Sequence, residues 1–172
     1  MNREEFIAYV EKEQEALRSF LFALCCGNKE DADDLAQDAL VKAYLSCAGY
    51  QDKGKFRSWL SKIAHNTFLN HKASQKTMES IDDAKISSSL PWGDERGAGE
   101  EPEPYEDLYL ALSTLPPKER SAITLFYMTG YSIKEIAQIT DTSEDAVKKQ
   151  LSRGRDKLKI KLGGSRNNEI TL

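Results

Sequence analysis

Residues 132–161 place the tightest limits on the fold, because they specify two helices joined by a short polar turn. Ser132 and Glu135 have the spacing of a capping box, in which two side chains bond free N–H groups at a helix start. Apolar residues then recur at helical spacing, until residues 141–143 interrupt them and offer the N-cap of a second helix. The stretch therefore predicts a helical hairpin.

The second helix of this hairpin has an apolar side and a polar, basic side. Val147, Leu151, Gly154 and Leu158 recur at i, i+4, i+7 and i+11, which predicts a buried seam. From Lys148 to Arg166 the chain has eight Lys or Arg residues and one acid. The side opposite the seam carries Thr142, Asp145, Lys149, Ser152 and Arg153, with Lys148 on its flank.

Two short helices with a tight turn form a helix-turn-helix, whose second helix enters the major groove of DNA. The density of basic residues favours contact with phosphate groups. Capping and periodicity establish only the hairpin, however, and many basic helix faces are merely solvated. Both interpretations stay open at this point.

The composition indicates a folded chain of one domain or two small ones, with 172 residues of which 40% are hydrophobic. No apolar run approaches the length of a membrane span, and the acidic N-terminus lacks the basic start of a signal peptide. We therefore expect a cytoplasmic protein without membrane insertion. Cys25, Cys26 and Cys47 are expected to be small buried hydrophobes, and without metal-ligand spacing around His65 or His71 we expect no metal and no cofactor.

Charge is distributed unevenly along the chain. Residues 1–77 carry 11 basic and 11 acidic side chains, a net charge of zero. Residues 78–117 carry 2 basic and 10 acidic side chains, a net charge of −8. Residues 118–172 carry 11 basic and 7 acidic side chains, a net charge of +4. Only the C-terminal third therefore has the charge of a nucleic-acid binder.

The N-terminal third is predicted to form three helices, over residues 3–26, residues 30–47 and from Phe56 onward. Acidic residues early in the second helix complement its dipole, but those later in it suggest an acidic docking face. The third helix has a second basic surface, with six basic residues and no acid between residues 53 and 78. This surface collects Lys62, His65, Asn66, Lys72 and Lys76, whereas Trp59 is expected in the core and Tyr50 and Phe56 are left undecided.

Residues 78–104 have the composition of a flexible acidic linker, rich in Ser, Gly, Pro and Glu. Helical patterns resume at Tyr105, and no strand pattern of any length appears. The sequence therefore predicts an all-α protein with two small helical domains, residues 1–77 and residues 105–172, joined by this linker.

Three groups of motifs resemble those of a known family, the bacterial RNA polymerase sigma factors. Four segments of this chain resemble region 4 of those proteins: Leu115-Pro-Pro-Lys-Glu-Arg120, Tyr131-Ser-Ile-Lys-Glu-Ile-Ala137, Thr142-Ser-Glu-Asp-Ala-Val-Lys148 and Leu151-Ser-Arg-Gly-Arg155. The segment Ala32-Asp-Asp-Leu-Ala-Gln-Asp38, together with Ala43-Tyr44, resembles region 2.2. The segment Lys55-Phe-Arg-Ser-Trp-Leu-Ser-Lys-Ile-Ala-His-Asn66 resembles regions 2.3 and 2.4. Nothing corresponds in size to region 3, which is typical of the extracytoplasmic-function (ECF) group of the sigma-70 family.

The resemblance implies a subunit that binds core RNA polymerase, directs promoter recognition and melting, and performs no covalent chemistry. It implies contacts to the −35 element by Thr142, Ser143, Lys148, Lys149, Ser152 and Arg153. It implies contacts to the single-stranded −10 element by Tyr50, Phe56, His65, Asn66, Asn70 and Lys72, and to the β′ clamp helices of the polymerase by Asp34, Gln37 and Asp38. Region 4 would meet the β flap, and the group commonly has a membrane-bound anti-sigma factor.

Two positions depart from the family pattern, Gln150 where Arg is frequent and Gly154 where Ala is frequent. Gly154 costs about 1 kcal/mol in a helix interior, and close helix packing is the reason we expect. Two other functions remain open: a helix-turn-helix regulator that binds duplex DNA without polymerase, and a sigma-like decoy or adaptor that binds an anti-sigma protein. An enzyme is disfavoured, because no phosphate loop or nucleophile motif is present.

Overall fold

The computed structural model describes residues 1–51, 54–81 and 106–166, which contain helices and no strand. The predicted linker lies outside these residues except for residues 78–81, which belong to the third long helix. The α-helices are α1 (Arg3–Leu24), α2 (Lys29–Ser46), α3 (Phe56–Ile81), α4 (Glu106–Ser113), α5 (Pro117–Ile123), α6 (Ile133–Thr140) and α7 (Glu144–Arg166). A 3-10 helix, η1 (Cys47–Gly49), follows α2, and a π-helix, η3 (Thr124–Met128), follows α5. The all-α prediction is confirmed.

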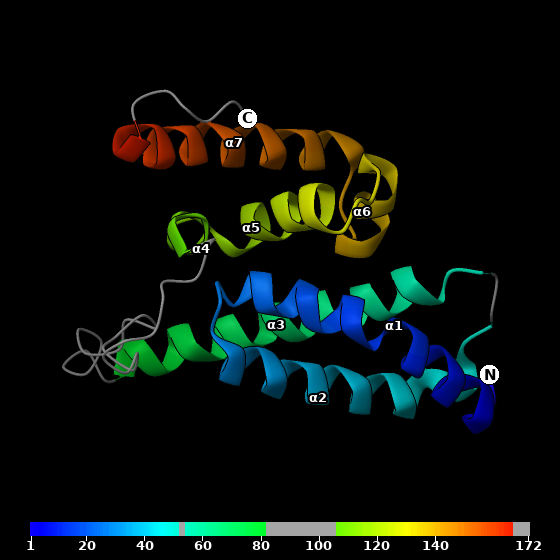
Figure 1. Cartoon of the computed structure of the whole chain (residues 1–172). Coiled ribbons are helices and arrows are strands. Elements are labelled where there is room, and N and C mark those ends of the chain that lie inside the picture. The colour runs from blue at the N-terminus through cyan, green and yellow to red at the C-terminus, as the bar shows by residue number, and fades with distance from the viewer. Residues whose placement is uncertain (52–53, 82–105, 167–172) are drawn as a thin grey trace.

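Helices α1, α2 and α3 form the N-terminal bundle, which Figure 1 shows below the other helices. Asn2 caps α1 in a capping box with Glu5, and Asn28 caps α2, so that side chains satisfy the free N–H groups of both starts. The core of the bundle is apolar and tightly enclosed, with Leu21, Ala36 and Phe68 fully buried. The predicted N-terminal helices are therefore present, with α1 ending two residues before the predicted boundary.

Helices α4 to α7 form the second group, in which α7 lies across the top of the molecule and α4, α5 and α6 lie beneath it (Figure 1). The predicted seam of α7 is confirmed, because Val147, Leu151 and Leu158 are all buried. Gly154 allows the helices to approach closely: a Cβ atom there would lie 2.8 Å from Cγ1 of Ile123 on α5. Close packing therefore accounts for a glycine in the interior of this helix.

The predicted hairpin is also confirmed, as α6 and α7. The Glu135 N–H donates to Oγ of Ser132, and the Ser132 N–H donates to a Glu135 carboxylate oxygen, each at 3.1 Å. Asp141 ends α6 with φ of 55°, a left-handed conformation that Asp tolerates better than most residues. Ser143 then accepts a 3.1 Å hydrogen bond from the Ala146 N–H, and α7 begins at the next residue.

The two groups of helices pack against each other, which the sequence did not predict. Helix α3 contacts α5 and α6, and α1 contacts η3. Phe22 of α1 and Tyr109 of α4 meet edge to face, with 5.6 Å between ring centroids. The buried apolar residues of both groups consequently form one continuous cluster.

The cysteines behave as small hydrophobes. Cys26 and Cys47 are buried, Cys25 is half-buried, and all three thiols are free. Burial, more than any nearby charge, raises the pKa of Cys25 to about 12, so this thiol stays protonated and unreactive at neutral pH. Within the described residues, no three metal-binding side chains come together, and no helix is long and apolar enough to cross a membrane.

Candidate nucleic-acid and protein interfaces

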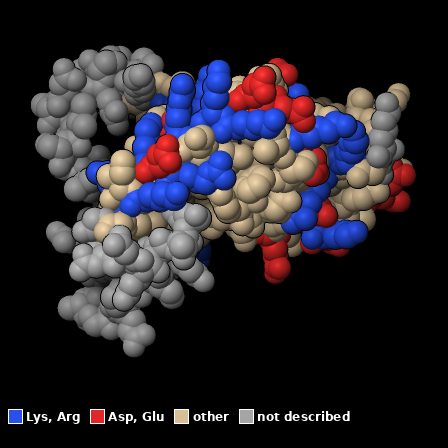
Figure 2. Space-filling model, turned by 90° about the horizontal axis from the view of Figure 1, so that it is seen from above, with Lys and Arg blue, Asp and Glu red and all other residues tan. Residues whose placement is uncertain are grey.

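The first half of α7 presents a basic, polar face to solvent. Lys148, Lys149, Ser152 and Arg153 are all exposed, opposite the buried seam. Figure 2 views the molecule from the α7 side and shows many Lys and Arg side chains over this face, with some acidic ones among them. A surface of this kind is able to contact both phosphates and base edges in a major groove.

Thr142 and Ser143, which were also predicted to meet DNA, have structural roles at the turn. The hydroxyl groups of Thr142 and Thr140 lie 2.8 Å apart, and Thr142 is half-buried. Ser143 uses its side-chain oxygen as the cap of α7. The capping bond occupies an acceptor and leaves the Ser143 hydroxyl hydrogen available to a phosphate oxygen.

Not every cation of α7 is available to DNA. Lys157 binds the carboxylate of Glu119 at 2.8 Å, and that carboxylate is buried. Arg155 donates a 3.2 Å hydrogen bond to the hydroxyl of Tyr127. The second half of the helix therefore uses some of its charge to hold α5 and η3 in place.

Helix α2 presents the acidic face that the sequence predicted, with Asp34, Gln37 and Asp38 all exposed. Val41, which the sequence also places on this face, is 58% exposed, and Leu45, which sequence reasoning missed, is 75% exposed. Asp34, Asp38, Val41 and Leu45 fall at i, i+4, i+7 and i+11, so they lie on one side of the helix. The periodicity that places Val41 on this face therefore continues one turn further, to Leu45.

The predicted −10 residues near the start of α3 are part of an aromatic cluster. Phe56 is 3% exposed and stacks on Tyr9, with 4.9 Å between ring centroids. Tyr50 stacks on Trp59 at 4.5 Å and is half-buried. In this arrangement Phe56 belongs to the core, whereas Tyr50 keeps some access to solvent.

The remaining predicted −10 residues separate into two sets. Asn66 and Asn70 are exposed on α3, and Lys72 is half-buried with its ammonium group 5.9 Å from the ring centroid of Phe68. His65 is instead 2% exposed. Burial, and to a smaller extent the positive charge of Lys118 on α5, lowers the pKa of His65 to about 4. The structure therefore places only part of the predicted set where DNA can reach it.

A polar seam joins the N-terminal bundle to the C-terminal helices. Arg120 on α5 is buried, donates to the carbonyl oxygen of Leu24 at 2.9 Å, and lies 5.7 Å from the ring centroid of Phe68. The hydroxyl groups of Ser61 on α3 and Tyr131 lie 2.9 Å apart. Burial raises the pKa of Tyr131, so its hydroxyl remains protonated and able to form this bond.

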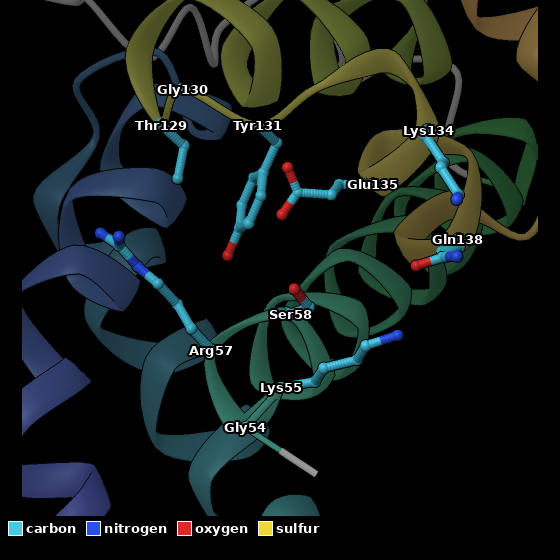
Figure 3. Close-up of a pocket in the computed structure, with 10 residues that line it drawn as sticks. All are labelled: Gly54, Lys55, Arg57, Ser58, Thr129, Gly130, Tyr131, Lys134, Glu135 and Gln138. Carbon is cyan, nitrogen blue, oxygen red and sulfur yellow. The ribbon is translucent and has the colours of Figure 1, made fainter.

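Beside this seam lies an open cleft of about 450 Å³, shown in Figure 3. Its walls are the start of α3, the turn that precedes α6, and α6 itself. The lining is Gly54, Lys55, Arg57, Ser58, Thr129, Gly130, Tyr131, Lys134, Glu135 and Gln138.

Comparison with protein families accounts for both groups of helices. Residues 9–77 match the family model for sigma-70 region 2, and residues 105–158 match the model for sigma-70 region 4. The chain is 32% identical over 142 residues to the ECF RNA polymerase sigma factor SigM of Bacillus subtilis, a match that covers 83% of this chain and 86% of that protein. The chain therefore belongs to the sigma-70 family, within its ECF group.

Other relatives agree with this assignment. The ECF sigma factor SigE of Mycolicibacterium smegmatis is 31% identical over 144 residues, and the match spans about half (52%) of that protein. Among solved structures, the sigma factor RpoE of Bartonella quintana, in complex with the anti-sigma factor NepR, superposes with a TM-score of 0.77 and 25% identity over 95% of this chain and 99% of that chain. CnrH, in complex with the cytosolic domain of CnrY, shares the fold, with a TM-score of 0.66. Sigma factors regulate transcription and are not catalysts, and the family implies core RNA polymerase and promoter DNA as partners.

Proposed function

We propose that this chain binds core RNA polymerase in the cytoplasm and directs it to a set of promoters, with region 2 and region 4 each contributing one DNA contact and one polymerase contact. The observation that carries the proposal is the pair of exposed faces, acidic and apolar on α2 and basic on α7, on a chain that matches regions 2 and 4 in order. A regulator that acts without polymerase would leave the α2 face unused.

The −35 contact is assigned to α7. Lys148, Lys149 and Arg153 would hold the helix on the phosphates, and Ser152 would contact base edges. Thr142 and Ser143 would act at the turn, where a free hydroxyl hydrogen can reach a phosphate. Gln150 is half-buried, unlike the exposed Ser152 and Arg153, so it contributes less to reading bases than a fully exposed side chain would.

The polymerase contact is assigned to the α2 stripe. Asp34, Gln37 and Asp38 would bind basic groups on the β′ clamp helices, while Val41 and Leu45 would be desolvated beside them. A charged rim around an apolar contact is the usual anatomy of a protein interface. Region 4 would meet the β flap.

The −10 contact requires the two regions to separate. Asn66, Asn70 and Lys72 are accessible on α3, and Tyr50 is partly so. Phe56 is buried against rings of region 2 itself, whereas His65 is buried where the charge of Lys118 on α5 acts on it. We propose that residues 1–77 and 105–172 act as two domains joined by residues 78–104, and that polymerase binding separates them. The polar seam supports this, because hydrogen bonds to water can replace those it loses.

An anti-sigma factor is also part of the proposal. The similar sigma factor RpoE was solved with the anti-sigma factor NepR, and it superposes over nearly the whole of this chain. We propose that such a partner, membrane-bound or soluble, competes with core polymerase for this protein.

Run-off transcription on fragmented genomic DNA tests the proposal. Purified core polymerase with this protein should give discrete new starts, and core alone should not. The variant K149A/R153A should lose these starts while it still binds core polymerase in a pull-down. Core binding without any starts would favour the decoy or adaptor function, and no core binding would favour a regulator of duplex DNA.

A further inference from the structure

The cleft beside the seam has walls from both regions. Region 2 contributes Lys55, Arg57 and Ser58, and region 4 contributes the turn before α6 and one side of α6. Its volume of about 450 Å³ is within the range of small-molecule sites, roughly 300–1,000 Å³. A molecule bound there would touch both regions at once.

Positive charge dominates this cleft. Three of its lining residues are cationic and only Glu135 is acidic. Figure 3 shows Lys55 and Lys134 along one edge, Arg57 toward the other edge, and Glu135 between them. The cleft therefore favours a ligand that carries negative charge.

The charges differ in how far they are already neutralised. Arg57 pairs with Glu13 at 3.2 Å, and the Glu135 carboxylate accepts the Ser132 N–H in the cap of α6. Neither Lys55 nor Lys134 forms an ion pair with any residue in the described part of the chain. One unneutralised ammonium group thus comes from each region, and a single anion between them would attract both.

The other lining groups suit phosphate better than an apolar molecule. The Ser58 hydroxyl and the Gln138 amide are hydrogen-bond donors, and Tyr131 is the only large ring in the lining. Lys55 precedes the first turn of α3 and has no side-chain oxygen to cap it, whereas Asn2, Asn28, Ser132 and Ser143 cap other helices. The first turn of α3, whose residues Arg57 and Ser58 line the cleft, is therefore not capped by a Lys55 side chain.

We propose that this cleft binds a small anion with two or more phosphate groups, of about nucleotide size, which bridges Lys55 of region 2 and Lys134 of region 4. Such a ligand binds only while the regions are packed, so it shifts the equilibrium toward the packed arrangement. Under the proposed function, this arrangement withholds His65 from the −10 element, and the ligand therefore opposes initiation. The binding step itself does not depend on the proposed function.

Isothermal titration of the full chain with sodium tripolyphosphate tests the binding step. We expect one site per chain, with affinity weakened about tenfold or more in the variant K55Q/K134Q, because both charge-assisted contacts are lost. The variant K55R/K134R keeps the charges and should stay close to the wild type. The control K29Q/K159Q removes two exposed cations outside the cleft and should also bind normally.

Several outcomes would overturn the proposal. Equal binding by K55Q/K134Q, or an equal loss in K29Q/K159Q, would show that the anion is attracted to the surface charge in general. Binding of a single-stranded oligonucleotide without binding of tripolyphosphate would assign these lysines to DNA. ATP in a parallel titration distinguishes a nucleotide source from inorganic phosphate, since only a nucleotide site should bind ATP more tightly than tripolyphosphate.

A second measurement addresses the bridge between regions. The variant S61A/Y131F lacks the hydroxyl pair of the seam, and we expect it to have a larger radius of gyration in small-angle X-ray scattering. Tripolyphosphate should restore the smaller, wild-type radius of gyration in this variant. It should not do so in the quadruple variant that also carries K55Q and K134Q. Binding without any compaction would overturn the bridging role. Because this measurement uses no polymerase, its failure is distinct from a failure in run-off transcription.

Discussion

Nη1 of Arg120 donates a 2.9 Å hydrogen bond to the carbonyl oxygen of Leu24, a residue 96 positions earlier in the chain. The same guanidinium group also donates to the carbonyl oxygens of Leu112 and Ser113, the last two residues of α4, and of Leu115, which follows the helix. One buried side chain therefore closes the end of α4 and joins region 4 to the end of α1. The guanidinium group of Arg has five N–H donors spread over a planar fork, whereas a Lys ammonium group has three donors on a single nitrogen.

The variant R120M should lower the free energy of unfolding by about 2–4 kcal/mol, because buried carbonyl groups lose their donor. R120K should be destabilised nearly as much, since it keeps the charge without the fork. Urea unfolding followed by circular dichroism measures both. R155M is the matched control: Arg155 makes one exposed hydrogen bond, so its loss should cost less than 1 kcal/mol. A similar loss in R120M and R155M would contradict this role.

Replacing Gly154 by Ala should destabilise the protein by about 1–3 kcal/mol, although Ala is the better helix former. The added Cβ atom would lie 2.8 Å from Cγ1 and 3.1 Å from Cδ1 of Ile123, which is itself buried. G163A provides the control on the same helix, because a Cβ atom there has nothing within 4 Å. Thermal unfolding should show a loss for G154A and none for G163A. A gain in both would mean that Ile123 moves aside at no cost.

Local signals in the sequence predicted most of the helices and the hairpin. The spacing of Ser132 and Glu135 defined the start of α6, and the spacing of the apolar residues from Val147 to Leu158 defined the buried side of α7. Both are set by residues within a few turns of each other, so they are visible without the fold. The π-helix η3 was not predicted from these local signals, and its residues contact α1, α5 and α6.

The site was predicted less completely than the fold. Helical periodicity does separate one side of α7 from the other, and Lys149 and Arg153 are exposed as predicted. The same reasoning placed His65 on a solvated basic face, and the structure buries it, because region 4 covers that side of α3. A contact between residues so far apart in the chain has no local pattern. The exposed Leu45 was missed for a different reason, since it lies one turn beyond Val41, at the end of a face recognised by its acidic residues.

His65 should make stability depend on pH. Its pKa is about 4 in the folded protein and about 6.5 as a free side chain, so folding favours the neutral form. The unfolded state then binds the extra proton as the pH falls below about 6.5, and the folded protein loses stability progressively until about pH 4. From this difference the full loss is about 3 kcal/mol.

Urea unfolding between pH 7 and pH 4.5 measures this dependence. Carboxylates also titrate there, so the informative quantity is the difference between the wild type and the variant H65Q, which has no titratable ring. H65Q should lose less stability than the wild type over this range. Parallel curves of unfolding free energy against pH for the two proteins would show that the pKa of His65 does not differ between the folded and unfolded states.

The α2 stripe should carry affinity for core polymerase through its apolar end as well as its acidic end. V41S/L45S should weaken core binding by about tenfold or more, since two exposed aliphatic side chains would no longer be desolvated on binding. D34K/D38K should weaken it further, mainly through slower association. Both variants change exposed residues, so their unfolding curves should match the wild type. Undiminished core binding by V41S/L45S in a fluorescence titration would restrict the interface to the acidic half.

Finally, the basic face of α7 should appear in the salt dependence of DNA binding. Each phosphate contact contributes about 0.9 to the slope of log K against log salt concentration, so K149A/R153A should reduce the slope by nearly 2. K157A is the control from the same helix, because the Lys157 ammonium group is held by Glu119 at 2.8 Å. It should leave the slope unchanged. If the slope falls equally in both variants, the helix attracts DNA through its total charge, and the exposed first half has no special role in binding the −35 element.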